Sequence, residues 1–171
     1  MIIQGKIITY IRDNINTDEI IPARYLNTSD PDELASHCME DLDKDFLENR
    51  KALDAEIMVT GANMGCGSSR EHAPVALAHA GIRAVVSPSF ARIFFRNAIN
   101  TGLPIFECKD PTFYEEIQAG NELEINADDG VIKNVTTGSE FQIQAMPAFL
   151  QDIVGVGGII PWAKAMLKKS K

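Results

Sequence analysis

The middle of the chain alternates short apolar runs with segments of helical composition, and this alternation constrains the fold more than any other feature. The predicted elements are a strand at Ala55–Thr60, a helix at Ser69–Ala80, a strand at Ile82–Ser87, a helix at Phe90–Asn100 and a strand at Leu103–Cys108. Each predicted helix is followed by a glycine, Gly81 or Gly102, which is a common helix stop. Strands that alternate with helices through short connections are typical of βαβ units on a parallel sheet. The sequence therefore predicts an α/β fold with a parallel core.

The flanking segments add a strand, short helices and an antiparallel unit. Ile2–Ile11 is rich in β-branched residues and predicts a strand, and Asp32–Arg50 predicts one or two short acidic helices. The remaining predicted elements are a helix at Thr112–Ala119, strands at Glu122–Asn126, Val131–Val135 and Phe141–Gln144, and a helical tail from Pro147 that is interrupted at Gly155–Gly158. The segment Ala127–Gly130 has the sequence of a hairpin turn. We expect one α/β domain over residues 1–171, with helices flanking the parallel sheet and an added antiparallel β hairpin.

Composition and charge exclude several classes of protein. At 171 residues, with 45% hydrophobic and 23% charged side chains, the chain is large enough to bury a core. A net charge of −8 argues against nucleic-acid binding, because phosphate contacts need clustered lysines and arginines. No apolar stretch is long enough to span a membrane, and no secretory signal is visible. We therefore expect a cytoplasmic protein.

The cysteines give no sign of a metal centre or a disulfide framework. Cys38, Cys66 and Cys108 are odd in number and far apart in the sequence. No C-x-x-C pair occurs, and no spacing of cysteine and histidine resembles a zinc or iron–sulfur site. We expect no metal or cofactor to be held by this chain alone.

A turn rich in glycine and serine connects the first central strand to the first central helix. Gly61–Pro74 contains three glycines, two adjacent serines and an arginine. A turn of this kind directs backbone N–H groups, the positive end of the helix dipole and a guanidinium toward one small volume. Gly65 and Gly67 would let the backbone approach a ligand closely, and Ser68-Ser69-Arg70 offers two hydroxyls and a clamp for a carboxylate. The turn therefore predicts a site for a small organic anion.

Other interpretations compete for this turn. Ser68 and Glu71 match a capping box, which is a purely structural role at the start of a helix. A P-loop requires G-x-x-x-x-G-K-[ST], and no lysine precedes the two serines. A dinucleotide-binding G-x-G-x-x-G does not fit, because the third glycine is missing. The capping box stays open as an alternative, whereas neither nucleotide-binding motif is present.

Three motifs in order along the chain resemble signatures of one family. Gly67–Ala73, with the sequence GSSREHA, resembles the signature of the swivelling domain of the aconitase superfamily. Asn16–Pro22, with the sequence NTDEIIP, and Asn97–Pro104, with the pattern N-x-x-N-x-G-L-P, resemble two further signatures of that domain. In length and span the chain resembles the free-standing small subunits of 3-isopropylmalate dehydratases. The resemblance implies a swivelling β/β/α domain.

The resemblance also implies that the chain is half of an enzyme. In this family a 4Fe-4S cluster lies on a separate large subunit, which would be the partner in a heterodimer or heterotetramer. The reaction removes water from a malate-type hydroxyacid and adds it back with the hydroxyl on the neighbouring carbon, as in leucine biosynthesis. By resemblance, Ser68 is the general base that removes and returns the C–H proton. Ser69 and Arg70 would bind a substrate carboxylate.

Asp18 and the loop that follows it leave alternatives open. Asp18 either assists the proton network as a second catalytic residue, as the resemblance implies, or makes an Asx-turn. Asn27 and Thr28 lie in the segment that distinguishes substrates in this family. A third carboxylate would need an arginine there, and its absence from Asn27–Ser29 favours isopropylmalate. Citramalate, dimethylmalate and the homocitrate-type substrate of a homoaconitase stay open.

A function of another class would be a non-catalytic anion-binding module. Such a module would bind the acid without a large subunit. The serine pair beside Arg70 offers more chemistry than binding alone requires, which favours the enzyme.

Overall fold

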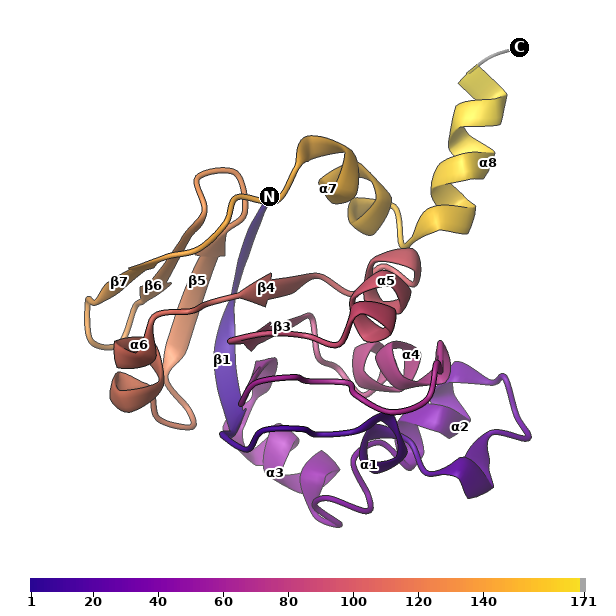
Figure 1. Ribbon diagram of the computed structural model, residues 1–171, viewed down its shortest axis with the longest axis horizontal. Helices are drawn as coiled ribbons and strands as arrows, with labels where there is room; N and C mark the ends of the chain where they lie inside the picture. Colours follow the sequence, from indigo (N-terminus) through magenta and orange to yellow (C-terminus); the bar gives the residue numbers. More distant parts are fainter. Residues whose placement is uncertain (170–171) are drawn as a thin grey trace.

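The computed structural model describes residues 1–169, within which seven strands form one mixed sheet (Figure 1). The strand order is β4-β3-β2-β1-β5-β6-β7. The strands are β1 (Ile2–Tyr10), β2 (Ala55–Thr60), β3 (Ala84–Ser87), β4 (Ile105–Glu107), β5 (Glu122–Asn126), β6 (Val131–Asn134) and β7 (Glu140–Gln142). Strands β1 to β4 pair in parallel, whereas β1, β5, β6 and β7 pair antiparallel. The predicted α/β fold is confirmed, and the strand predicted at Phe141–Gln144 pairs with the predicted hairpin as β7.

Strand β1 joins the two parts of the sheet. Its first half, Ile2–Lys6, pairs with β5, and its second half, Lys6–Tyr10, pairs with β2. The register with β2 shifts between Lys6 and Ile7, where the pairing partner of β1 changes. As a result, β3 and β4 run in a clearly different direction from β5 and β6 (Figure 1). The parallel part is buried on both faces, since every residue of β3 is buried, whereas β5 alternates between buried and half-exposed positions.

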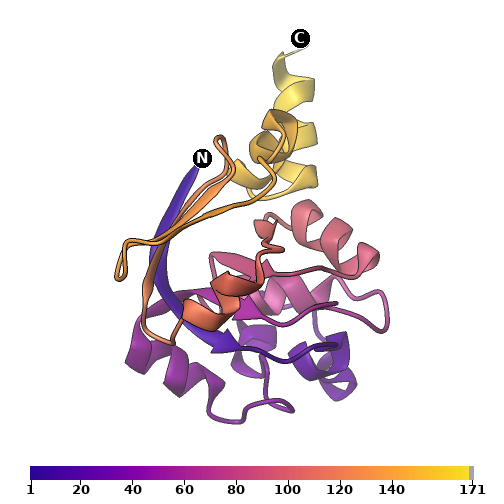
Figure 2. The ribbon, with the colours of Figure 1, turned by 60° about the vertical axis from the view of Figure 1, so that its left-hand side comes forward.

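Most of the helices lie where the sequence predicts them. They are α1 (Thr17–Ile20), α2 (Pro31–Ser36), α3 (Phe46–Leu53), α4 (His72–His79), α5 (Arg92–Asn100), α6 (Pro111–Glu116), α7 (Ala148–Gly155) and α8 (Ile159–Lys169), together with a 3₁₀ turn, η1 (Ala23–Tyr25). Helix α4 connects β2 to β3 and α5 connects β3 to β4, as expected for βαβ units. Figure 2 shows α8 extending away from the rest of the described chain. No helix within residues 1–169 is long and apolar enough to cross a lipid bilayer.

Helix α4 begins later than predicted. The sequence predicts a start at Ser69, but the first helical residue is His72 and the residue before it, Glu71, makes no capping hydrogen bond. Pro74 gives the reason. A helix that began at Ser69 would place Pro74 beyond the first turn, where it has no N–H to donate to the carbonyl of Arg70 and its ring would collide with that turn. The capping box of Ser68 and Glu71 is therefore wrong, and Arg70 lies on the loop before the helix.

Candidate active site

The loops that follow β1, β2 and β3 meet at one edge of the sheet. Parallel strands have their carboxyl ends on the same side, so the segments after Tyr10, Thr60 and Ser87 leave the sheet together. Figure 1 shows the first two of these segments running side by side toward α1 and α4. We call residues 61–71 the glycine loop.

Hydrogen bonds to both neighbouring loops hold the first half of the glycine loop. The N–H of Asn14 donates to the carbonyl of Ala62 at 2.9 Å, and the N–H of Gly65 donates to the carbonyl of Ile15 at 2.8 Å. On the other side, the buried hydroxyl of Ser87 contacts the carbonyl oxygens of Gly61 and Ser89, each at 2.7 Å. The loop is thus tied to both neighbouring loops before its exposed tip begins.

The backbone conformation at Gly65 and Gly67 explains why glycine stands at these two positions, apart from the predicted approach to a ligand. Gly65 has a φ of +77°, and a Cβ on it would lie 2.1 Å from the ring of Phe94, so this position must be empty for α5 to pack. Gly67 has a φ of +96°, and a Cβ there would lie 3.4 Å from Oγ1 of Thr17. Both glycines thus have a left-handed backbone, but only at Gly65 would a side chain also collide with a neighbour.

The turn from β1 into α1 carries a capping box at a position that the sequence analysis did not assign. The side chain of Asn16 accepts hydrogen bonds from the N–H groups of Asp18 and Glu19, and the carboxylate of Glu19 accepts from the N–H of Asn16. Asp18 is therefore not the residue that makes the turn, and the Asx-turn alternative for it is wrong. Its carboxylate instead forms an ion pair with Arg70.

Arg70 reaches from the glycine loop to α1. Its side chain is 15% exposed, whereas that of Asp18 is 55% exposed. Nη1 of Arg70 contacts the Asp18 carboxylate and also donates to the carbonyl of Ile21 at 3.3 Å. Within residues 1–169, no hydrogen bond is donated by Nη2 or Nε of this guanidinium. One edge of the guanidinium is therefore available to another anion.

Ser68 is linked to α1 by Thr17. The hydroxyl of Thr17 donates to the backbone carbonyl of Ser68 at 3.0 Å and lies 3.4 Å from the Ser68 hydroxyl. Thr17 is buried, whereas Ser68 is exposed at the loop tip. The structure thus brings Ser68, Asp18 and Arg70 together around the start of α1. Sequence reasoning gave Thr17 no role, although it stands inside the NTDEIIP motif.

The other predicted site residues are less connected. Ser69 is exposed next to Ser68, without a hydrogen-bond partner in the described chain. Asn27 is also exposed, and the Thr28 hydroxyl accepts a hydrogen bond from the N–H of Asp30 at 3.1 Å. Neither Asn27 nor Thr28 contacts Ser68 or Arg70 among residues 1–169. The segment that carries Asn27 and Thr28 is linked to the Arg70 guanidinium through the carbonyl of Ile21, which precedes it in the chain.

The cysteines do not form a centre for a metal or cluster. Burial raises the pKa of the thiols of Cys38 and Cys108, which makes both weak ligands and weak nucleophiles. Cys66 is half-buried in the glycine loop, with its sulfur 3.4 Å from the carbonyl of Asn14. Residues 1–169 contain no group of three or more His, Cys, Asp or Glu side chains placed to hold a metal ion. These residues therefore do not fit an iron–sulfur cluster.

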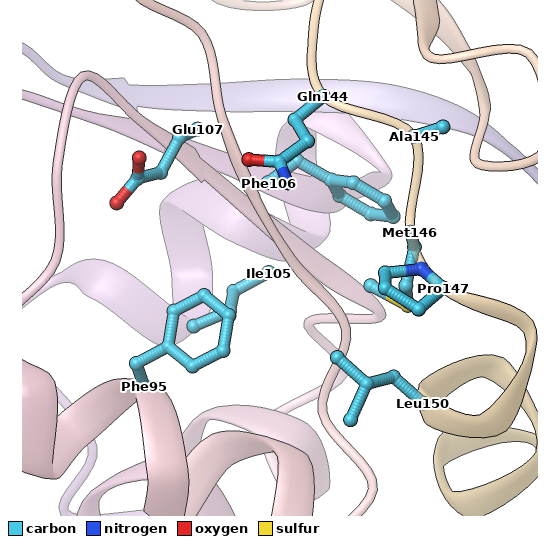
Figure 3. Close-up of a pocket in the computed structure, with 9 residues that line it drawn as sticks. All are labelled: Phe95, Ile105, Phe106, Glu107, Gln144, Ala145, Met146, Pro147 and Leu150. Atoms are coloured by element: carbon cyan, nitrogen blue, oxygen red, sulfur yellow. The ribbon is translucent and has the colours of Figure 1, made fainter.

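A separate cavity of about 330 Å³ lies between β4, α5 and the segment that leads into α7 (Figure 3). Apart from Glu107 and Gln144, its side chains are apolar, and Phe95 and Leu150 face each other across it. The Glu107 carboxylate pairs with Lys109 at 3.4 Å. None of the predicted site residues lines this cavity, and it offers little for acid–base chemistry. Its lining consists of Phe95, Ile105, Phe106, Glu107, Gln144, Ala145, Met146, Pro147 and Leu150.

Comparison with known proteins identifies the family to which a chain with this fold and this site belongs. The model of the aconitase C-terminal domain matches residues 2–110, which is more than half of the chain and includes every residue discussed at the site. The chain therefore belongs to the aconitase C-terminal domain family.

Relatives that cover nearly the whole chain narrow the class. The 3-isopropylmalate dehydratase small subunit of Caldicellulosiruptor bescii is 54% identical over 99% of both chains. The 2,3-dimethylmalate dehydratase small subunit of Eubacterium barkeri is 52% identical over 96% of this chain and 98% of the relative. The crystal structure of a 3-isopropylmalate dehydratase from Methanocaldococcus jannaschii superimposes with a TM-score of 0.86 at 39% identity, covering 99% of this chain and 98% of the other. Within the class, the chain thus falls among the small subunits of 3-isopropylmalate-type dehydratases.

Proposed function

We propose that residues 1–171 act as one swivelling domain, the small subunit of a hydro-lyase that interconverts 3-isopropylmalate and 2-isopropylmalate in leucine biosynthesis. The observation that carries the proposal is the position of Ser68. Ser68 is exposed at the loop tip, at the carboxyl edge of the parallel strands, and the hydroxyl of a buried threonine lies 3.4 Å from the Ser68 hydroxyl. Arg70, two residues further along the loop, pairs with Asp18, the residue after that threonine. This arrangement supports acid–base chemistry on a small anion.

Ser68 is proposed as the base that removes and returns the C–H proton. A serine hydroxyl is a poor base at its ordinary pKa, so its oxygen needs nearby positive charge and hydrogen-bond donors. Arg70, two residues after Ser68, is proposed to supply this charge, and the N–H groups that begin α4 lie shortly after it in the chain. Asp18 is proposed to act with Ser68 by fixing the guanidinium in place.

Arg70 and Ser69 are proposed to bind a substrate carboxylate. The hydrogen bond to Ile21 and the ion pair with Asp18 both use Nη1 of Arg70, and Nε and Nη2 are proposed as a two-pronged donor. A carboxylate fits such an edge with two parallel hydrogen bonds. The exposed hydroxyl of Ser69 would donate a third. Asn27 and Thr28 are proposed to contact the part of the substrate that differs between relatives.

The partner is proposed to be a large subunit that carries a 4Fe-4S cluster, in a heterodimer or heterotetramer. The relative's small-subunit name supports a two-chain enzyme, and residues 1–169 offer no ligand set of their own for such a cluster. The bound cluster would supply a Lewis acid for the substrate hydroxyl. The exposed tip of the glycine loop would then face the partner. Such an enzyme would work in the cytoplasm.

The substrate has a second candidate. A relative that is 52% identical bears the name of a 2,3-dimethylmalate dehydratase small subunit, so high identity is compatible with another C5-branched acid. Asn27 and Thr28 carry no charge, which disfavours a third carboxylate such as that of a homocitrate-type acid. Citramalate and dimethylmalate therefore belong in every assay beside isopropylmalate.

The test is an anaerobic hydratase assay with the reconstituted large subunit, comparing Ser68→Ala with Ser69→Ala. The cap of α4 does not depend on the Ser68 hydroxyl, so we expect its removal to leave the fold intact, and assembly with the partner is measured in parallel. We expect Ser68→Ala to lower kcat by roughly 10³-fold or more, and Ser69→Ala mainly to raise KM. Near-normal kcat in Ser68→Ala would refute the role of Ser68. Tight binding of these acids by the single chain, without turnover in the complex, would favour the anion-binding module.

A further inference from the structure

A buried threonine makes both of its side-chain polar contacts with the proposed base. Thr17 is 2% exposed. Its Oγ1 donates to the backbone carbonyl of Ser68 at 3.0 Å and lies 3.4 Å from Oγ of the same residue. Its own N–H donates to the carbonyl of Cys66 at 2.8 Å, which fixes the backbone of Thr17 against the glycine loop.

Counting protons assigns the direction of the second contact. A threonine hydroxyl has one proton, and the carbonyl of Ser68 can only accept. While Thr17 donates to that carbonyl, the 3.4 Å contact is a hydrogen bond only if the Ser68 hydroxyl donates to Oγ1 of Thr17. A length of 3.4 Å exceeds the usual range for O–H···O bonds, so the contact is weak in the resting arrangement. Catalytic hydrogen bonds are often long before substrate binds.

We propose that Thr17 is a positioning residue that turns its hydroxyl from the Ser68 carbonyl to the Ser68 side-chain oxygen when that oxygen is deprotonated. This inference rests on the proposed function of Ser68 as the base. The turn needs only rotation about the Cβ–Oγ bond of Thr17, and it breaks one hydrogen bond and forms another. The proton that Ser68 loses passes to water, to which its side chain is exposed. A hydrogen bond to an oxyanion is shorter and stronger than one to a neutral carbonyl.

The surroundings make Thr17 suited to this task. Its backbone starts α1 and is held by the Asn16 capping box, and a β-branched side chain has few rotamers, so its oxygen stays close to Ser68. No charged side chain hydrogen-bonds to either hydroxyl in the described part of the chain. The titratable and charged groups on the elements packed around this pair lie on α1, on the segment before it, on the glycine loop and on α4. They are Arg12, Asp13, Asp18, Glu19, Cys66, Arg70, Glu71, His72 and His79.

The test compares Thr17→Val with Thr17→Ser in the complex with the large subunit, by the pH dependence of kcat. Valine keeps the shape and removes the hydroxyl, whereas serine keeps the hydroxyl. We expect Thr17→Val to lower kcat by roughly 10²-fold at neutral pH, with KM and assembly close to wild type. Because the lost donor stabilises the deprotonated base, the acidic limb of the profile should move up by about two pH units. Thr17→Ser should stay within a few-fold of wild type.

Several outcomes separate this role from a structural one. A Thr17→Val complex with wild-type kcat, or with a loss that is equal at every pH, would overturn the proposal. If the valine variant does not assemble, Thr17→Ala takes its place with the same expectation relative to Thr17→Ser. Asp18→Asn in parallel identifies any shift that comes from that carboxylate. An active Ser68→Ala would instead overturn the proposed function itself, so the two failures are distinguishable.

Discussion

Two loops beside the proposed site are held in opposite ways. The glycine loop is fixed by backbone hydrogen bonds to its neighbours and by the packing of Gly65 on the ring of Phe94. The loop at residues 23–30 is fixed at its start by exposed side chains. Arg24 contacts Glu40 and Asp41, and Tyr25 stacks on His37 with ring centroids 3.6 Å apart.

This difference indicates which part of the fold can tolerate amino-acid substitutions. A loop held by backbone hydrogen bonds and by a closely packed glycine keeps its geometry, so chemistry that must be placed within a fraction of an ångström belongs there. A loop held by exposed ion pairs contributes little to stability, so its residues can be exchanged at small cost. Relatives that are 54% and 52% identical bear the names of dehydratases for two different acids. We infer that the glycine loop carries the residues that perform the reaction, whereas loop 23–30 determines which substrate is preferred.

The largest effect is expected from a methyl group at Gly65. Gly65→Ala places a Cβ 2.1 Å from the Phe94 ring at a left-handed φ of +77°, so Phe94 or the loop must move. We expect a loss of about 3 kcal/mol or more in the free energy of unfolding, from the clash and the backbone strain together. Chemical denaturation measures this loss.

Gly138→Ala is the matched control for that variant. Its φ is +87°, but a Cβ there meets nothing within 4 Å, so only backbone strain remains. A loss of about 1 kcal/mol is expected. Equal losses of unfolding free energy at both positions would mean that the Phe94 ring moves aside at little cost. The glycine loop would then be less rigid than its contacts imply.

Much of the fold could be predicted from the sequence because the determining signals are local. Strand β1 and the central alternation follow from apolar runs and glycine stops, and two helix starts follow from an aspartate before a proline, at Asp30 and Asp110. The sequence does not predict helix α1, because four residues are too few to show a helical period of hydrophobic residues. The start of α4 was misplaced although Pro74, two residues into the helix, marks it.

The candidate site was predictable as a set of residue types but not as a set of contacts. The motifs named Ser68, Asp18 and Arg70, yet nothing local shows that Asp18 pairs with Arg70 across more than fifty residues. The same holds for Thr17, whose hydroxyl meets Ser68 only because the loops after β1 and β2 lie side by side. Such pairings arise from strand order, which a single sequence does not display.

A smaller effect is expected from a positive charge introduced into loop 23–30. Asn27→Arg would provide a partner for a third carboxylate and remove a neutral neighbour of an apolar substituent. We expect the ratio of kcat/KM for a homocitrate-type acid over isopropylmalate to rise about tenfold, which corresponds to one charge-assisted hydrogen bond. Competitive assays with the assembled enzyme measure the ratio. Asn27→Gln controls for added length without charge, and an unchanged ratio in the arginine variant would remove Asn27 from the substrate contacts.

The smallest effect is expected at Glu40, which holds the start of loop 23–30. Its carboxylate accepts hydrogen bonds from His37 at 2.8 Å, Tyr25 at 3.0 Å and Arg24 at 3.1 Å. The hydrogen bond with the His37 ring is the main cause that lowers the pKa of Glu40. A carboxyl group whose pKa is lower in the folded state stabilises the fold above its unfolded pKa of about 4.3, and this contribution is lost as the pH falls through the folded value.

Glu40→Gln should therefore destabilise the chain at pH 7, and the effect should shrink as the pH falls below the unfolded pKa of about 4.3. Because the group is partly exposed, solvent screening limits the loss at pH 7 to about 0.5 kcal/mol, or a fall in Tm of about 1–2 °C. Glu115→Gln, at an exposed position without an ion pair in residues 1–169, controls for the change in net charge. A fall in Tm that is as large at pH 3 as at pH 7 would show that the shape of the Glu40 side chain matters more than its charge. In that case loop 23–30 would depend on packing after all, and the contrast with the glycine loop would be one of degree.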